Sequence, residues 1–273
     1  MKSALQTLKH NLICAGFFMK LNVQADMEYP TFLVGWFISN ALQFVVGVLS
    51  LKFITNTFQA INGWSFAEIL FMYGIGIISH ALSIILFIQT WYLEYFVTQG
   101  EFDRMLVRPL GVFMQYTFAA TNLIGLTDLV PGLCILLYGT VQVGLPATPG
   151  NIGKILAIIA GATLIRGGLY VLLASVSFWT KRGGLTEVLT DTFAKLTQYP
   201  LSIYGKTMQA LFTFLIPIGF ICFYPASAFL GKDAGYQMLL DPAILTPAVG
   251  VLTFVAGMIV FKLGMKRYES AGS

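Results

Sequence analysis

The chain has 273 residues, of which 57% are hydrophobic and 10% are charged, and its formal net charge is +4. Soluble domains carry about 25% charged residues, so this composition cannot cover a water-facing surface. In lipid, only helices and closed barrels satisfy the hydrogen bonds of the backbone. The apolar stretches are unbroken over the roughly 20 residues that a spanning helix needs, whereas barrel strands alternate over about 10 residues. The composition therefore predicts an all-α integral membrane protein.

The cysteines and the basic residues exclude two further classes. Cys14, Cys134 and Cys222 lie far apart and form no CxxC pair, which argues against a disulfide framework or a metal site. The basic residues stand at the ends of the apolar stretches, so the net charge does not indicate binding to nucleic acid. The N-terminus lacks the pattern of a cleaved signal peptide, and we expect the first apolar span to stay in the mature protein.

The first 29 residues predict a helix that lies in the inner membrane interface. The polar residues of this helix fall mostly on the side opposite its apolar face, which is typical of an interfacial amphipathic helix. A frayed start to the first span is the alternative. The apolar face of this helix consists of Leu5, Leu8, Leu12, Ala15 and Met19.

Six apolar stretches follow, each long enough to cross a hydrocarbon core of about 30 Å at about 1.5 Å per residue. They cover residues 30–51, 66–91, 112–139, 152–179, 201–224 and 243–264. The chain is thus predicted to form one membrane domain. It would consist of the interfacial helix over 1–29, a six-helix bundle over 30–264 and a tail over 265–273. The semi-apolar segment 225–241 is a candidate for folding back into the outer interface.

The basic residues predict the orientation, because cytoplasmic loops are enriched in Lys and Arg. With the N-terminus inside, twelve basic residues fall on the inner side and three on the outer side, and both termini are predicted to be cytoplasmic. The outer set is Lys52, Lys154 and Lys232. The inner set is Lys2, Lys9, Lys20, Arg104, Arg108, Lys181, Arg182, Lys195, Lys206, Lys262, Lys266 and Arg267.

Motifs for catalysis are missing from the sequence. Two segments resemble a nucleotide-binding loop, and both fail: Ile155 follows the Gly-Lys pair at 153–154, and Pro200 stands where the first glycine should precede 205–207. The sequence contains no HExxH or GxSxG motif, and His10 and His80 are its only histidines. We therefore expect no catalytic residue, bound metal or cofactor in this chain.

The connection between the second and third spans, residues 99–110, predicts a short amphipathic helix that ends before Pro109. Its apolar face consists of Phe102, Met105 and Leu106. Charged contacts come from Glu101, Asp103, Arg104 and Arg108. Such a helix at the membrane surface can press against a soluble partner, and an ordinary connector is the alternative.

This loop is similar to the loop of a family of bacterial ABC-2 type permeases. Three more segments resemble the same family in the same order: Ser-Phe-Trp at 177–179, the Tyr-Pro-Leu and Ile-Pro-Ile-Gly-Phe pieces within 199–226, and the tail at 264–273. The resemblance runs from residue 100 to the end, whereas the first 99 residues agree with the family only in topology.

The resemblance implies the permease subunit of an ATP-binding cassette exporter in the bacterial cytoplasmic membrane. Two permeases, identical or paralogous, would work with two copies of a soluble ATPase that binds ATP and Mg. The match assigns the ATPase contact to Gly100, Glu101, Asp103, Arg104, Arg108 and Pro109. It gives neither the substrate nor the role of the tail.

Three ionisable residues, His80, Asp128 and Arg166, lie far from the ends of the predicted spans. A charge there costs about 2.5–3.5 kcal/mol, so each residue needs a reason. Asp128 and Arg166 lie at similar depths in antiparallel helices, and we expect them to form an ion pair. The three residues are either structural or part of a pathway. An ion-coupled secondary transporter or channel is thus the alternative to an exporter, and a scaffold protein is a third possibility, although no internal repeat favours the transporter.

Overall fold

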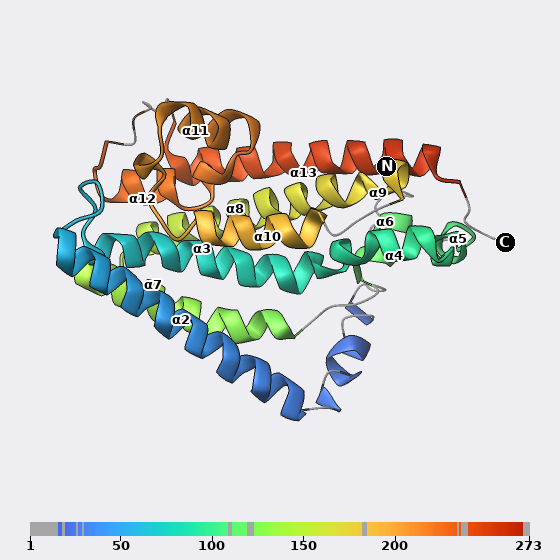
Figure 1. Ribbon diagram of the computed structural model, residues 1–273, viewed down its shortest axis with the longest axis horizontal. Helices are drawn as coiled ribbons and strands as arrows, with labels where there is room; N and C mark the ends of the chain where they lie inside the picture. The colour runs from blue at the N-terminus through green and yellow to red at the C-terminus, as the bar shows by residue number, and fades with distance from the viewer. Residues whose placement is uncertain are drawn as a thin grey trace.

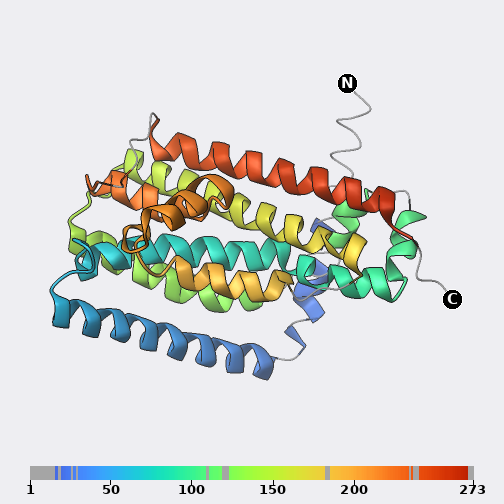
Figure 2. The same ribbon diagram turned by 45° about the horizontal axis from the view of Figure 1, so that its top comes forward.

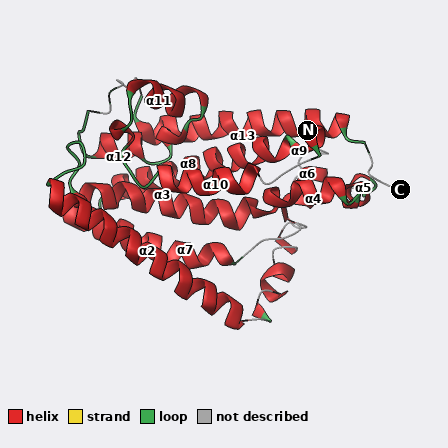
Figure 3. Cartoon of the chain, viewed as in Figure 1, coloured by secondary structure: helices red, strands yellow, loops and turns green. Residues whose placement is uncertain are grey.

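The computed structural model describes residues 16–17, 20–25, 27–28, 30–108, 111–118, 123–181, 185–233, 235 and 240–269. In this part of the chain every regular element is a helix, which confirms the predicted all-α class (Figure 3). Five helices are long and apolar enough to cross a membrane. They are Pro30–Phe58, Phe66–Thr98, Ile124–Val143, Pro149–Thr180 and Pro242–Met265.

Several of these spans consist of consecutive helical pieces. The first half of the chain forms α2 (Pro30–Phe58), α3 (Phe66–Phe87), η1 (Ile88–Tyr92), α4 (Leu93–Thr98), α5 (Glu101–Leu106), α6 (Val112–Phe118) and α7 (Ile124–Val143). The second half forms α8 (Pro149–Ser175), α9 (Ser177–Thr180), α10 (Leu185–Leu196), η2 (Leu201–Ile203), α11 (Lys206–Ala210), η3 (Leu211–Leu215), η4 (Ile218–Phe220), α12 (Phe223–Phe229) and α13 (Pro242–Arg267).

The long helices run lengthwise through an elongated bundle (Figures 1 and 2). Helices α3, α7, α8 and α13 pack side by side, while α2 lies along one flank against α7 and touches α3 only lightly. Helix α5 and the end of α13 lie at one extremity, which we call the α5 end. The connections α2–α3 and α7–α8 lie at the other, which we call the turn end (Figure 1).

Glycines bring the central helices into close contact, as small residues do in membrane bundles. A Cβ atom added at Gly161 of α8 would lie 2.5 Å from the backbone nitrogen of Pro247 in α13. One added at Gly168 would lie 2.6 Å from the nitrogen of Phe254. Gly139 brings α7 equally close to α3. Helices α8 and α13 are therefore packed backbone to backbone over several turns.

The continuous helix predicted over 201–224 is wrong. Helix α10 runs lengthwise in the bundle instead, and the chain from 201 to 229 breaks into short helical pieces at the turn end (Figures 1 and 2). The break has a local cause: Pro217 has no backbone N–H to donate, and Ile216 before it is extended at φ −121° and ψ 95°. Since α10 has 12 residues, or about 18 Å, it is shorter than a hydrocarbon core of about 30 Å.

The described residues test only part of the predictions about the two ends of the chain and about the orientation of the helices. The apolar face predicted for 1–29 and the tail residues 270–273 lie outside the described residues. Lys206, counted on the inner side, begins α11 at the turn end, opposite the α5 end (Figure 1). Because residues 201–224 form no continuous helix, six spans are not confirmed. The cytoplasmic position of both termini stays a prediction.

Candidate functional site

Helix α5 begins where Gly100 reverses the chain after α4. Gly100 has φ +70°, a left-handed conformation that glycine adopts without steric cost. Glu101 and Asp103 occupy the first turn of α5, where the partial positive charge of a helix start favours acidic side chains. At the other end, Nε2 of Gln115 in α6 donates to the backbone oxygen of Met105 at 3.2 Å. The sequence thus defines both ends of this short helix.

The apolar side of α5 is buried in a group of aromatic rings at the α5 end. Phe102 is 0% exposed, and its ring centroid lies 5.3 Å from that of Phe178 in α9 and 6.5 Å from that of Phe261 in α13. The ring of Tyr268, just beyond α13, lies 5.0 Å away. We call Phe102, Phe178, Phe261 and Tyr268 the ring cluster. It joins three parts of the chain that are far apart in sequence.

The other side of α5 is open. Arg104 and Arg108 are exposed, and Glu101 and Asp103 are half-buried. Leu106, predicted on the apolar face, is 46% exposed, so this detail of the prediction is wrong. Pro109 lies outside the described residues. The charged residues predicted to contact an ATPase therefore lie at or near the surface, backed by the ring cluster.

Segments with sequence motifs converge here. Phe102 belongs to the loop 99–110, Phe178 to the Ser-Phe-Trp segment and Tyr268 to the tail. Gly264 of the tail segment faces the ring of Phe178, since a Cβ atom there would lie 2.4 Å from its Cδ2 atom. Three of the four segments that carried the resemblance thus form a single packing unit.

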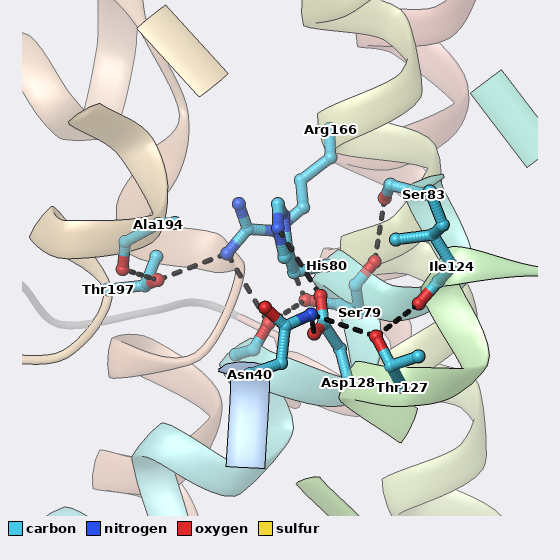
Figure 4. A network of polar contacts seen from close by, with 11 residues as sticks. Asn40, Ser79, His80, Ser83, Ile124, Thr127, Asp128, Arg166, Ala194 and Thr197 are labelled. Carbon is cyan, nitrogen blue, oxygen red and sulfur yellow. Dashed lines mark hydrogen bonds and ion pairs between the residues drawn. The ribbon is translucent and has the colours of Figure 1, made fainter. Parts of the chain in front are cut away.

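A second group of polar residues lies in the middle of the bundle (Figure 4). Nδ2 of Asn40 in α2 donates to Oδ1 of Asp128 in α7 at 2.7 Å and to Oγ1 of Thr127 at 2.8 Å. Nε2 of His80 in α3 lies 3.9 Å from the other carboxylate oxygen of Asp128. Asp128 thus has an amide and an imidazole as its partners, and Asn40 fixes α2 to the bundle.

Arg166 in α8 is 0% exposed and turns to other partners. Its Nε donates to Oγ of Ser79 at 3.3 Å, and its Nη2 donates to the backbone oxygen of Gly76 at 3.4 Å. Nη2 also donates to Oγ1 of Thr197, the residue after α10, at 3.1 Å (Figure 4). No ion pair joins Arg166 and Asp128 in the described residues, so the predicted pairing is wrong. The guanidinium group donates to α3 and to the residue after α10, and not to Asp128.

The protein-family model described as ABC-2 family transporter protein matches residues 41–272 of the chain. The chain belongs to the ABC-2 transporter family. This confirms the resemblance drawn from the motifs and extends it to most of the first 99 residues. No curated protein matches the chain. As an ABC-2 family member with several apolar helices, it is a multi-pass membrane protein and a component of membrane transport that is not itself catalytic. ABC-2 permeases generally work with ATPase subunits.

Some residues of the polar network and of the ring cluster were not predicted from the sequence. The polar network also contains Asn40, Ser79 and Thr197. Amides and hydroxyls are common in apolar spans and carry no charge, so the sequence gives no reason to expect these three residues in a site. Tyr268 stood in a recognised motif without an assigned role. Among the described residues, His, Cys, Asp and Glu form no group of three that could hold a metal ion.

Proposed function

We propose that this chain is the membrane-spanning permease subunit of an ATP-binding cassette exporter in the bacterial cytoplasmic membrane. One observation carries the proposal: a short helix at one end of the bundle buries its aromatic residue among two other parts of the chain and leaves charged residues on its open side. The contact residues would be Gly100, Glu101, Asp103, Arg104 and Arg108, with Pro109 following them.

The packing of α5 gives this proposal a mechanical basis. Interiors are close-packed and resist compression, so a displacement of Phe102 is passed to Phe178 and Phe261. Phe178 belongs to α9, which continues α8, and Phe261 belongs to α13, which packs on α8 through the glycine contact. A push on the open side of α5 would therefore move long helices of the bundle. ATP and Mg would be bound by the partner, and this chain would supply the translocation pathway.

The assembly would contain two permeases, identical or paralogous, and two ATPase subunits. The family supports the ATPase partner, because ABC-2 permeases generally work with ATPase subunits. The exposed apolar side chains along α2, such as Leu42, Val46 and Phe53, leave that flank open to lipid or to the second permease.

The test is an affinity purification of the tagged chain from gently solubilised membranes, followed by an ATPase assay on the eluate. We expect a soluble ATPase to elute with the wild-type chain and to be lost when Glu101, Asp103 and Arg104 are all replaced by Ala. The triple variant keeps Phe102, so α5 should stay packed. A matched control replaces two exposed charges far from α5, Lys52→Ala and Asp233→Ala, and should retain the ATPase.

Elution of the chain alone in several mild detergents would contradict the proposal. An ion-coupled secondary transporter or channel would then be the better hypothesis. His80, Asp128 and Arg166 would become the residues to replace first, with ion-dependent uptake into vesicles as the measurement.

A further inference from the structure

The residue that follows α13 reaches back to the start of the predicted ATPase contact. Tyr268 ends α13 in an extended conformation, at φ −62° and ψ 126°, and its N–H donates to the oxygen of Met265 at 3.3 Å. This turn places its ring 5.0 Å from Phe102 of α5 and 6.2 Å from Phe178 of α9. A residue outside any helix therefore contacts two helices that are more than 80 residues away along the chain.

Helix α5 depends on such contacts for its position. It has six residues, and isolated helices shorter than about 12 residues are marginal in water. Its neighbours in the chain offer little restraint, because Gly100 before it adopts φ +70° and Val107 after it is 84% exposed. What places α5 is the packing of Phe102 and Met105 and the hydrogen bond from Gln115.

We propose that Tyr268 is a positioning residue that seats α5 against the end of α13, so that the two helices move as one body. The edge-to-face arrangement of its ring with Phe102, at an interplanar angle of 63°, is the favourable one for aromatic pairs. Because α13 packs closely on α8, this contact extends the rigid part of the bundle to the surface where α5 is open. The tail segment thus has a mechanical role. The consequence for transport rests on the proposed function, but the seating of α5 does not.

The test measures the distance between α5 and α13 directly. Spin labels are attached at Val107→Cys and Leu263→Cys, two exposed positions, in a chain whose three native cysteines are replaced. Double electron–electron resonance then gives the distribution of distances. Tyr268→Ala removes two ring pairs, so we expect the ratio of seated to displaced α5 to fall roughly tenfold, seen as a second, broader population.

Two controls separate the ring from the tail as such. Tyr268→Phe keeps the ring and should give the wild-type distribution. Glu269→Ala removes the exposed neighbouring side chain and should also leave the distribution unchanged. If Tyr268→Ala does not accumulate in the membrane, Tyr268→Leu takes its place and should broaden the distribution to a smaller extent. If Tyr268→Ala leaves the distance distribution unchanged, the proposal is overturned. It is also overturned if Glu269→Ala broadens the distribution as much as Tyr268→Ala does.

A second readout links the seating of α5 to transport. With the ATPase bound, Tyr268→Ala should lower the amount transported per ATP hydrolysed, while Tyr268→Phe and Glu269→Ala should not. Full coupling in Tyr268→Ala together with a displaced α5 would overturn the view that α5 and α13 move as one body. If no ATPase binds the wild-type chain, the proposed function fails, whereas the distance measurement still decides the role of Tyr268.

Discussion

The two ends of the bundle are held together by different interactions. At the α5 end, the contacts are aromatic rings packed edge to face. At the turn end, rings also pack, as Trp64 does on Phe223 at 5.7 Å, but charged and polar groups add further contacts. Lys232 lies 2.8 Å from the carboxylate of Glu68, and Nδ2 of Asn62 donates to the oxygen of Ser202 at 2.8 Å. Among the described residues, the turn end thus combines rings with ion pairs, whereas the α5 end is held mainly by rings.

This difference bears on how each end can move. Ring contacts have no fixed bond direction, but close-packed rings resist compression, so a displacement of one ring is passed to the others. Charge-assisted hydrogen bonds require one distance and one orientation. The α5 end is therefore suited to being displaced by a partner. The turn end is suited to holding the broken segment 201–229 in one place against the α2–α3 connection.

The largest expected effect comes from the glycine contact that joins both ends. Gly161→Leu would place side-chain atoms where the backbone of Pro247 lies, 2.5 Å from a Cβ atom. Overpacking costs about 1–3 kcal/mol where side chains can yield, and a backbone yields less. We expect Gly161→Leu to abolish folded protein, measured as the monodisperse fraction in size-exclusion chromatography.

The control for this variant lies in the same helix. Gly153 has no heavy atom within 4 Å of an added Cβ atom, so Gly153→Leu should fold normally. Equal yields of the two variants would contradict the close packing of α8 on α13, and with it the mechanical link between the two ends.

Phe102→Ala tests the α5 end. Truncating a fully buried Phe costs about 3–5 kcal/mol, more than a six-residue helix can absorb, so we expect α5 to leave the ring cluster. Arg104 and Arg108 would then become better trypsin sites, and limited proteolysis should show faster cleavage there. Leu106→Ala, which truncates a side chain that is 46% exposed, should cleave at the wild-type rate. Similar rates for both variants would show that α5 does not depend on its buried ring.

The sequence predicted the features that depend on local pattern. Four of the six spans agree with helices of the structure because length and apolarity suffice to define them, and Phe102 and Met105 are buried as the spacing of α5 required. The span predicted over 112–139 is wrong in its bounds, because it begins in the separate helix α6 and ends within α7. The span over 201–224 failed because hydropathy does not register a backbone break at Pro217.

The pairing of Asp128 with Arg166 failed for a different reason. Counting residues gives the depth of a side chain along a helix but not the neighbour that it faces. Arg166 faces α3 and the end of α10, whose lengthwise position in the bundle the sequence did not predict. The hydrogen-bond donor to Asp128 is Asn40, an amide on a helix that packs loosely, and no pattern within one helix could identify it.

Lys232 is the corresponding test at the turn end. Its Nζ atom lies 2.8 Å from Glu68, 2.5 Å from the backbone oxygen of Gly63 and 5.6 Å from the centre of the Trp64 ring. Hydrogen bonds to charged groups contribute about 1.5–3 kcal/mol, so Lys232→Met should lower the free energy of unfolding by an amount in this range and reduce the melting temperature. Lys52→Met, at an exposed position of α2, should leave the melting temperature unchanged. A turn end that tolerates both changes equally would not be held by its charges.

The smallest expected effect is the pH dependence of the other ion pair at the turn end. Nζ of Lys154 donates to Oδ2 of Asp241 at 2.6 Å, and this bond, followed by the one from the N–H of Ala243, holds the pKa of Asp241 below its usual value near 3.8. A lowered pKa means that the carboxylate stabilises the fold at higher pH and loses this effect as the pH falls through the folded-state value.

Asp241→Asn removes the charge but keeps an oxygen that can accept from Ala243 at the start of α13. The wild type should therefore melt slightly above Asp241→Asn at neutral pH, and the difference should vanish as the pH falls below 3.8. The difference should be small and should shrink with added salt, because both side chains are more than a third exposed. A difference that stays constant down to acid pH would assign it to the helix cap and not to the charge, and would weaken the contrast between a turn end with ion pairs and an α5 end held mainly by rings.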